Sequence, residues 1–168
     1  MNLPNKITFG RIISTIIFII ILSVNFPYKE AVSALVFIVI VLSDAVDGFI
    51  ARKTNQITTL GKFIDPLADK LLISAALIFL IGHGLAPWMA YTIIAREFIV
   101  TGLRLIAISK NKIISASKLG KIKTILQVVG ILALLLNLEF SYYFMLIATI
   151  FTIISGLDYL KKNIKLLE

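Results

Sequence analysis

Long apolar runs alternate along the chain with short polar breaks, such as "NFPYKE", "GHGLAP" and "NLEFS". The breaks contain residues that are typical of turns. Each run approaches the roughly 20 residues that a helix needs to cross a bilayer, and a helix satisfies its own backbone groups in lipid. The pattern therefore predicts an all-α integral membrane bundle of six transmembrane helices, at about residues 7–24, 31–50, 63–81, 88–108, 119–136 and 142–160.

Composition favours the same class of protein. Hydrophobic residues make up 59% of the 168 residues, whereas soluble domains are about 45–50% apolar. The sequence has no internal repeat and no low-complexity tract, which predicts a single membrane domain over residues 1–168. The basic start lacks a clear cleavage site, so the first run is interpreted as a retained span and not as a signal peptide.

Lysine and arginine are distributed unevenly over the connections between the runs. The three connections on one side contain only Lys29 between them, whereas the termini and connections on the other side hold most of the basic residues. Because basic residues in short loops mark the cytoplasmic side, we expect both termini in the cytoplasm. This asymmetry and anionic lipid headgroups account for the net charge of +8. The pattern lacks the basic groove of a soluble nucleic-acid-binding domain, so nucleic acid is not an expected partner.

Four of the five aspartates of the chain lie in one stretch, "SDAVDGFIARKTNQITTLGKFIDPLADK". Asp44 and Asp47 are three positions apart, and Asp65 and Asp69 are four apart, so each pair shares a helix face. If the two helices are antiparallel neighbours, all four carboxylates meet in the cytoplasmic half of the membrane. Ionised side chains are costly there and usually mark a functional site.

Such a cluster needs cations to neutralise it. Carboxylate oxygens suit hard divalent ions such as Mg²⁺. The chain has no cysteine and one histidine, which disfavours a zinc or copper site. The alternative is a set of structural ion pairs with Arg52, Lys62 and Lys70, and for any single aspartate this alternative stays open. Gly48 and Gly61 would leave room for a ligand beside the acids, or would serve ordinary helix packing.

These residues form a motif, Asp44-x-x-Asp47-Gly48-x-x-Ala51-Arg52, then eight residues, then Gly61-x-x-x-Asp65-x-x-x-Asp69. The motif resembles the signature of the CDP-alcohol phosphotransferases in every defined position and gap. The resemblance implies transfer of a substituted phosphate from a CDP-linked donor to an alcohol, with release of CMP. It also implies a divalent metal, Mg²⁺ or Mn²⁺ with two ions per site, and a homodimer.

The resemblance also implies roles for single residues. Asp44, Asp47 and Asp65 would be metal ligands. Asp69 would be the general base and would also contact the second metal. The residues that would line the CDP site are Gly48, Ala51, Arg52 and Gly61.

The stretches "IIAREFIVTGLRLIA" and "KLGKIKT" bear on the acceptor. Arg96 and Glu97 lie in the middle of an apolar run, where a charge needs a function. A guanidinium suits a phosphate dianion, so Arg96, Arg104 and Lys121 are the candidates for binding an acceptor's phosphate. Internal pairing of Arg96 with Glu97 or with a partner across the bundle is an equal alternative. Lys118 and Lys123 are interpreted as simple positive-inside charge and not as phosphate ligands.

With the start Pro4-Asn5-x-Ile7-Thr8-x-x-Arg11, these stretches resemble the bacterial phosphatidylglycerophosphate synthase branch of the family. This resemblance implies CDP-diacylglycerol as donor and sn-glycerol 3-phosphate as acceptor, in the bacterial cytoplasmic membrane with the active site facing the cytoplasm. Other acceptors stay open, namely phosphatidylglycerol, serine or inositol phosphate. A divalent-cation transporter is the rival from another class. Such a path needs polar residues up to the outer face, and runs such as "LLISAALIFLIG" have almost none.

Overall fold

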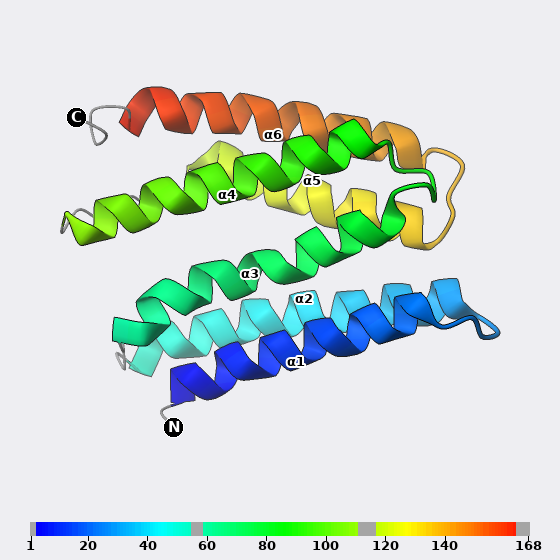
Figure 1. Cartoon of the computed structure of the whole chain (residues 1–168), viewed down its shortest axis with the longest axis horizontal. Coiled ribbons are helices and arrows are strands. Elements are labelled where there is room, and N and C mark those ends of the chain that lie inside the picture. Colours follow the sequence, from blue (N-terminus) through cyan, green and yellow to red (C-terminus); the bar gives the residue numbers. More distant parts are fainter. Residues whose placement is uncertain (1–2, 55–58, 111–116, 164–168) are drawn as a thin grey trace. The chain divides into compact units, whose positions relative to one another are not determined.

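The computed structural model is all-helical in the part of the chain that it describes (Figure 1). It describes the backbone of residues 3–54, 59–110 and 117–163, and the side chains of residues 10–43, 70–110 and 117–163. Each helix overlaps one of the six predicted segments, so the predicted all-α class and the order of the helices are confirmed. The helices are α1 (Leu3–Ser23), α2 (Lys29–Thr54), α3 (Thr59–Leu80), α4 (Pro87–Ser109), α5 (Lys118–Leu135) and α6 (Ser141–Asn163).

The helix ends follow local sequence signals. The loop between α3 and α4 contains Gly82 and Gly84, both with positive φ (84° and 87°), a conformation that glycine adopts without strain. Pro87 then begins α4, where its missing N–H costs nothing. At the end of α5, Asn137 has a φ of 51°, and the Leu138 N–H donates to the Ala133 carbonyl over 2.9 Å. This pair of features is a Schellman motif, which terminates the helix.

The first compact unit covers Met1–Phe79 and contains α1, α2 and nearly all of α3. Helices α1 and α2 run side by side and antiparallel, joined by a short loop (Figure 1). Phe18 and Phe37 are fully buried between them, with ring centroids 5.6 Å apart. The outer face of α1 is apolar, because Ile13, Ile16 and Ile20 are each at least half exposed.

The second compact unit covers Leu80–Glu168, and in it α6 packs against both α4 and α5. Its fully buried apolar side chains include Met89, Ile93, Ile131 and Met145. Gly130 of α5 allows the close contact with α6, since a Cβ there would lie 2.5 Å from the Met145 sulfur. Close helix packing through a glycine is common in membrane bundles.

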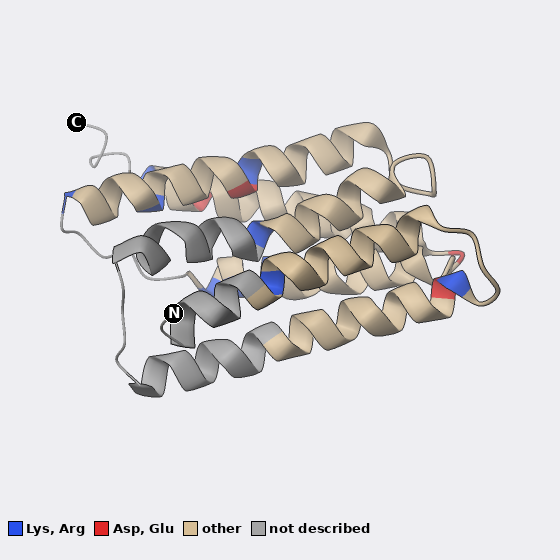
Figure 2. Ribbon diagram, turned by 60° about the horizontal axis from the view of Figure 1, so that its bottom comes forward, with Lys and Arg blue, Asp and Glu red and all other residues tan. Residues whose placement is uncertain are grey.

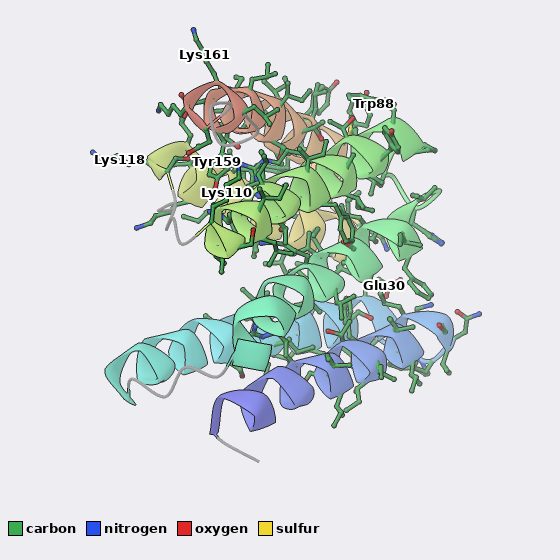
Figure 3. All side chains as sticks on the ribbon, turned by 60° about the vertical axis from the view of Figure 1, so that its left-hand side comes forward. Glu30, Trp88, Lys110, Lys118, Tyr159 and Lys161 are labelled. Atoms are coloured by element: carbon green, nitrogen blue, oxygen red, sulfur yellow. The ribbon has the colours of Figure 1, made fainter. Side chains whose placement is uncertain are left out.

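The two ends of the second unit differ in the residues that they carry. Within the described residues, α6 is the one helix long and apolar enough to cross a membrane. Charged residues are sparse along the described helices (Figure 2). Lys110, Lys118 and Lys161 lie at one end of the unit, and Trp88 lies at the other (Figure 3). The unit therefore has a basic end and an end that carries an amphipathic aromatic residue.

Candidate functional site

The predicted metal-binding aspartates belong to two of the observed helices. Asp44 and Asp47 are residues of α2, which continues to Thr54, and Asp65 and Asp69 are residues of α3, which begins at Thr59. Continuous helix keeps each pair at the spacing that shares a face. The side chains of these four residues, and the other motif residues Gly48, Ala51, Arg52 and Gly61, lie outside the residues whose side chains the structure describes.

The donor chemistry of these aspartates fits a hard divalent cation, because all the ligands they offer are carboxylate oxygens. Among the side chains that are described, no group of three or more His, Cys, Asp or Glu could hold a metal ion.

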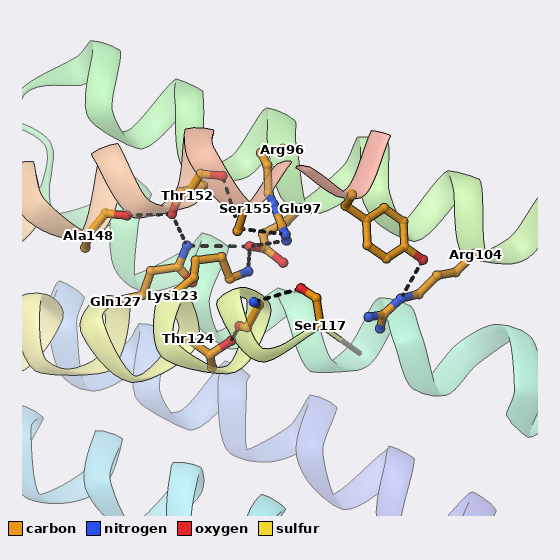
Figure 4. A network of polar contacts seen from close by, with 12 residues as sticks. Arg96, Glu97, Arg104, Ser117, Lys123, Thr124, Gln127, Ala148, Thr152 and Ser155 are labelled. Carbon is orange, nitrogen blue, oxygen red and sulfur yellow. Dashed lines mark hydrogen bonds and ion pairs between the residues drawn. The ribbon is translucent and has the colours of Figure 1, made fainter. Parts of the chain in front are cut away.

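The second unit contains a buried polar network that joins its three helices (Figure 4). Helix α4 contributes Arg96 and Glu97, α5 contributes Lys123 and Gln127, and α6 contributes Thr152 and Ser155. All of these side chains are buried except that of Arg96, which is 12% exposed. Polar groups in such a place must satisfy one another, since burial without a partner is costly.

The Glu97 carboxylate is the centre of the network. Lys123 Nζ donates to Glu97 Oε1, and Arg96 Nη1 lies 3.5 Å from the same oxygen. Gln127 Nε2 also lies 3.5 Å from this oxygen and donates to Thr152 Oγ1 over 2.9 Å. One carboxylate thus faces two cations, and the group of three side chains keeps one net positive charge.

Arg96 extends from α4 to α6. Its Nη2 donates to Ser155 Oγ over 3.0 Å. Its Nε is buried and has no hydrogen-bond partner within the described residues. The stem of Arg96 passes over Gly156, where an added Cβ would lie 2.9 Å from Arg96 Cγ. The path of this side chain therefore depends on residue 156 being a glycine.

Arg104 makes a similar contact two helical turns further along α4. Its Nε donates to the Tyr159 hydroxyl over 3.3 Å, and its Cζ lies 5.6 Å from the centroid of the Tyr159 ring. This distance is within the range of a cation–π interaction. Tyr159 is itself buried in a cluster with Val100 and Leu103. Both candidate arginines are therefore oriented by α6.

Lys121, the third candidate for the acceptor's phosphate, is exposed on α5. No hydrogen bond or ion pair joins it to Arg96 or Arg104 in the described part of the chain. Two positions along a helix correspond to about 200° of rotation, so Lys121 and Lys123 point to different sides of α5. The structure joins the two arginines to α6 and shows no contact that joins Lys121 to them in the described part of the chain.

Some residues of this network were not expected from the sequence. Lys123 was interpreted as simple positive-inside charge, but it is buried and paired with Glu97. The internal partners considered for Arg96 are both present, Glu97 beside it and Ser155 across the bundle. The contacts of Gln127 and Tyr159 were not predicted from the sequence. An amide inside the apolar run of α5 was the signal that could have revealed the network, because it needs a partner there.

The chain is similar to known proteins over most of its length. A sequence model of the CDP-alcohol phosphatidyltransferases matches residues 1–154. A Bacillus subtilis (strain 168) protein named CDP-diacylglycerol–glycerol-3-phosphate 3-phosphatidyltransferase is 46% identical over 183 aligned positions, which cover 96% of this chain and 95% of the relative. Proteins of the same name from Salmonella paratyphi A and Rickettsia bellii are 35% and 36% identical, over 95% of this chain and 93% and 94% of theirs.

Proposed function

The chain belongs to the CDP-alcohol phosphatidyltransferase family, and from this premise we propose that it transfers the phosphatidyl group of CDP-diacylglycerol to sn-glycerol 3-phosphate. The products are phosphatidylglycerophosphate and CMP. The observation that carries the proposal is the 46% identity to a relative of that named activity, which extends over nearly the whole of both chains.

Asp44, Asp47 and Asp65 are the proposed metal ligands, and Asp69 is the proposed ligand of a second ion as well as the general base. When bound, two Mg²⁺ or Mn²⁺ ions neutralise the pyrophosphate and the departing CMP. The support is the oxygen-only donor set and its spacing on α2 and α3. Gly48, Ala51, Arg52 and Gly61 are the proposed contacts of the CDP moiety.

The acceptor's phosphate is the proposed ligand of Arg96, Arg104 and Lys121. The support for the arginines is their geometry. Hydroxyls of α6 accept from both of them, and Arg96 shares the Glu97 carboxylate with Lys123, so that these three charged groups keep one net positive charge. A guanidinium binds a phosphate dianion through two parallel hydrogen bonds, which also fixes the orientation of the acceptor.

In the proposed reaction a free hydroxyl of glycerol 3-phosphate attacks the lipid-linked phosphorus. The new O–P bond forms as the bond to the CMP oxygen breaks, and the hydroxyl proton passes to the Asp69 carboxylate. A carboxylate within hydrogen-bond reach of the hydroxyl is sufficient for this step. The transfer is direct, because no separate nucleophile stands out in the sequence.

The proposed setting is the bacterial cytoplasmic membrane. The six helices are proposed to cross it, with both termini and the active site on the cytoplasmic side, in a homodimer. The supports are the apolar length of α6, the exposed isoleucines of α1 and the bias of basic residues toward one set of helix ends.

The test is CMP release by the purified protein in detergent with CDP-diacylglycerol and Mg²⁺. Glycerol 3-phosphate, glycerol, serine and inositol phosphate are supplied in parallel, and a chelator and the Asp69→Asn variant are the controls. The expected result is release with glycerol 3-phosphate alone, lost in both controls. Release with a different acceptor would refute the proposed acceptor and its arginine ligands. No release with any acceptor, from folded protein, would refute the transferase.

A further inference from the structure

Two hydroxyl groups of α6 contact the two arginines of α4 (Figure 4). We propose that Ser155 and Tyr159 are positioning residues, whose hydroxyls orient Arg96 and Arg104 for the phosphate of the acceptor. The inference rests on the proposed function and extends it to residues outside the family match, which covers residues 1–154.

The spacing of the four residues fits this role. Ser155 and Tyr159 are four positions apart, so they share one face of α6. Arg96 and Arg104 are eight positions apart, which is about 12 Å along the axis of α4. Val100 lies between the arginines and is buried in the cluster that contains Tyr159. This apolar cluster joins α4 to α6 between the positions of the two arginines.

Ser155 presents an acceptor to Arg96 because its proton is used elsewhere. Its hydroxyl donates to the Thr152 carbonyl over 3.3 Å, which turns the oxygen lone pairs toward Arg96 Nη2. The serine adds no negative charge, so the one counter-charge near Arg96 among the contacts described here is Glu97, which Arg96 shares with Lys123. Each terminal nitrogen of an arginine has two hydrogens, so Nη1 and Nη2 can each donate once more, to a phosphate.

Tyr159 leaves the binding edge of Arg104 open. Its hydroxyl accepts from Nε, and its ring lies beside the guanidinium carbon. These two contacts fix the plane of the guanidinium. Among the contacts of the described residues, the hydrogen bond of Arg104 uses Nε and not Nη1 or Nη2. The pair of terminal nitrogens is one of the guanidinium edges that bind a phosphate in a bidentate manner.

The experiment compares Ser155→Ala and Tyr159→Phe with the wild type in the CMP-release assay. Each variant removes a single hydroxyl. Tyr143→Phe removes a hydroxyl from the exposed start of the same helix and is the matched control. KM is measured for each substrate at a saturating concentration of the other, and thermal unfolding in detergent is measured for all proteins.

Each α6 variant is expected to raise the KM for glycerol 3-phosphate about fivefold, the factor that corresponds to one ordinary hydrogen bond. The KM for CDP-diacylglycerol and all values for Tyr143→Phe should stay at the wild-type level. A purely structural role would instead lower the unfolding temperature. The ratio of the KM for glycerol 3-phosphate to the KM for CDP-diacylglycerol would then stay at its wild-type value, which would overturn the inference. A lowered KM for glycerol 3-phosphate would also overturn it, because the hydroxyls would then compete with the phosphate.

Calorimetric binding of glycerol 3-phosphate to the resting protein separates this inference from the proposed reaction. If the wild type binds it and releases no CMP, the proposed reaction fails while the inference is still tested. Weaker binding by both variants then supports the positioning role. Equal binding by wild type and variants, or no binding by the wild type, overturns it.

Discussion

Lys123 of α5 and Glu97 of α4 form an ion pair in the interior of the second unit, where their side chains are 3% and 4% exposed. The same carboxylate oxygen faces Arg96 Nη1 at 3.5 Å. Glu97 is therefore the shared counter-charge of two cations that belong to different helices. Removing one member of a buried pair leaves the other charge uncompensated in a place that water does not reach.

Glu97→Gln is expected to lower the free energy of unfolding by about 3 to 5 kcal/mol, the usual cost of breaking a buried ion pair from one side. Lys123→Met should cost less, because Glu97 keeps Arg96 as a partner. Denaturant or thermal unfolding in detergent measures both. The matched control is Lys162→Met, which breaks the exposed pair with Asp158 and should change stability by about 1 kcal/mol at most. If Glu97→Gln were as stable as Lys162→Met, Glu97 would not be the shared counter-charge of Lys123 and Arg96.

Gly156→Ala is expected to displace Arg96. The new Cβ would lie 2.9 Å from Cγ, which belongs to the stem of the side chain and cannot swing away as a chain end could. We expect a higher KM for glycerol 3-phosphate and no gain in stability. Gly102→Ala is the control, since a Cβ there meets no described atom within 4 Å, and it should stabilise α4 by up to about 1 kcal/mol. If the two variants behaved alike, Gly156 would not determine the path of Arg96.

The six helices could be predicted because long apolar runs are a strong signal that does not depend on tertiary contacts. The ends were less well predicted. Helix α2 continues through Arg52 to Thr54, and α3 begins at Thr59, before the apolar run expected from residue 63. Hydrophobicity marks the segment that avoids water, whereas a helix continues as far as its backbone hydrogen bonds do.

The network around Glu97 could be predicted only in part. The charges in α4 indicated an internal partner, but that partner, Ser155, is 59 positions away, and helical spacing relates only near neighbours. Hydroxyls in an apolar helix are also ambiguous signals. Thr149 and Thr152 each donate to a carbonyl of their own helix, and only Thr152 also accepts from another helix.

Gly130→Ala tests the packing of α5 against α6. A Cβ would lie 2.5 Å from the Met145 sulfur and 3.5 Å from its Cα, so the helices must separate or the methionine must move. Overpacking of this kind is expected to cost about 1 to 3 kcal/mol of unfolding free energy. The double variant with Met145→Ala should lose less than the two single variants together, because the clash is then absent. Strict additivity of the three unfolding energies would argue against the contact.

Asp69→Asn is expected to lower the rate of CMP release by at least about a hundredfold, the usual contribution of a general base. The change removes a negative charge and keeps the shape of the side chain. Asp158→Asn is a matched control, because Asp158 pairs with Lys162 on α6 and lies outside the aspartate motif. Similar losses in both variants would indicate a general effect of charge on folding, which the unfolding temperatures would reveal.

Arg104→Lys tests whether the shape of the guanidinium matters in addition to its charge. Lysine keeps the positive charge but has neither the Nε donor that Tyr159 accepts nor the planar pair of terminal nitrogens. Loss of charge-assisted hydrogen bonds is therefore expected to raise the KM for glycerol 3-phosphate about tenfold or more. Lys161→Ala removes an exposed charge from the end of α6 and should leave this KM unchanged. A wild-type KM in Arg104→Lys would mean that charge alone attracts the acceptor, and the bidentate geometry assigned to Arg104 would be wrong.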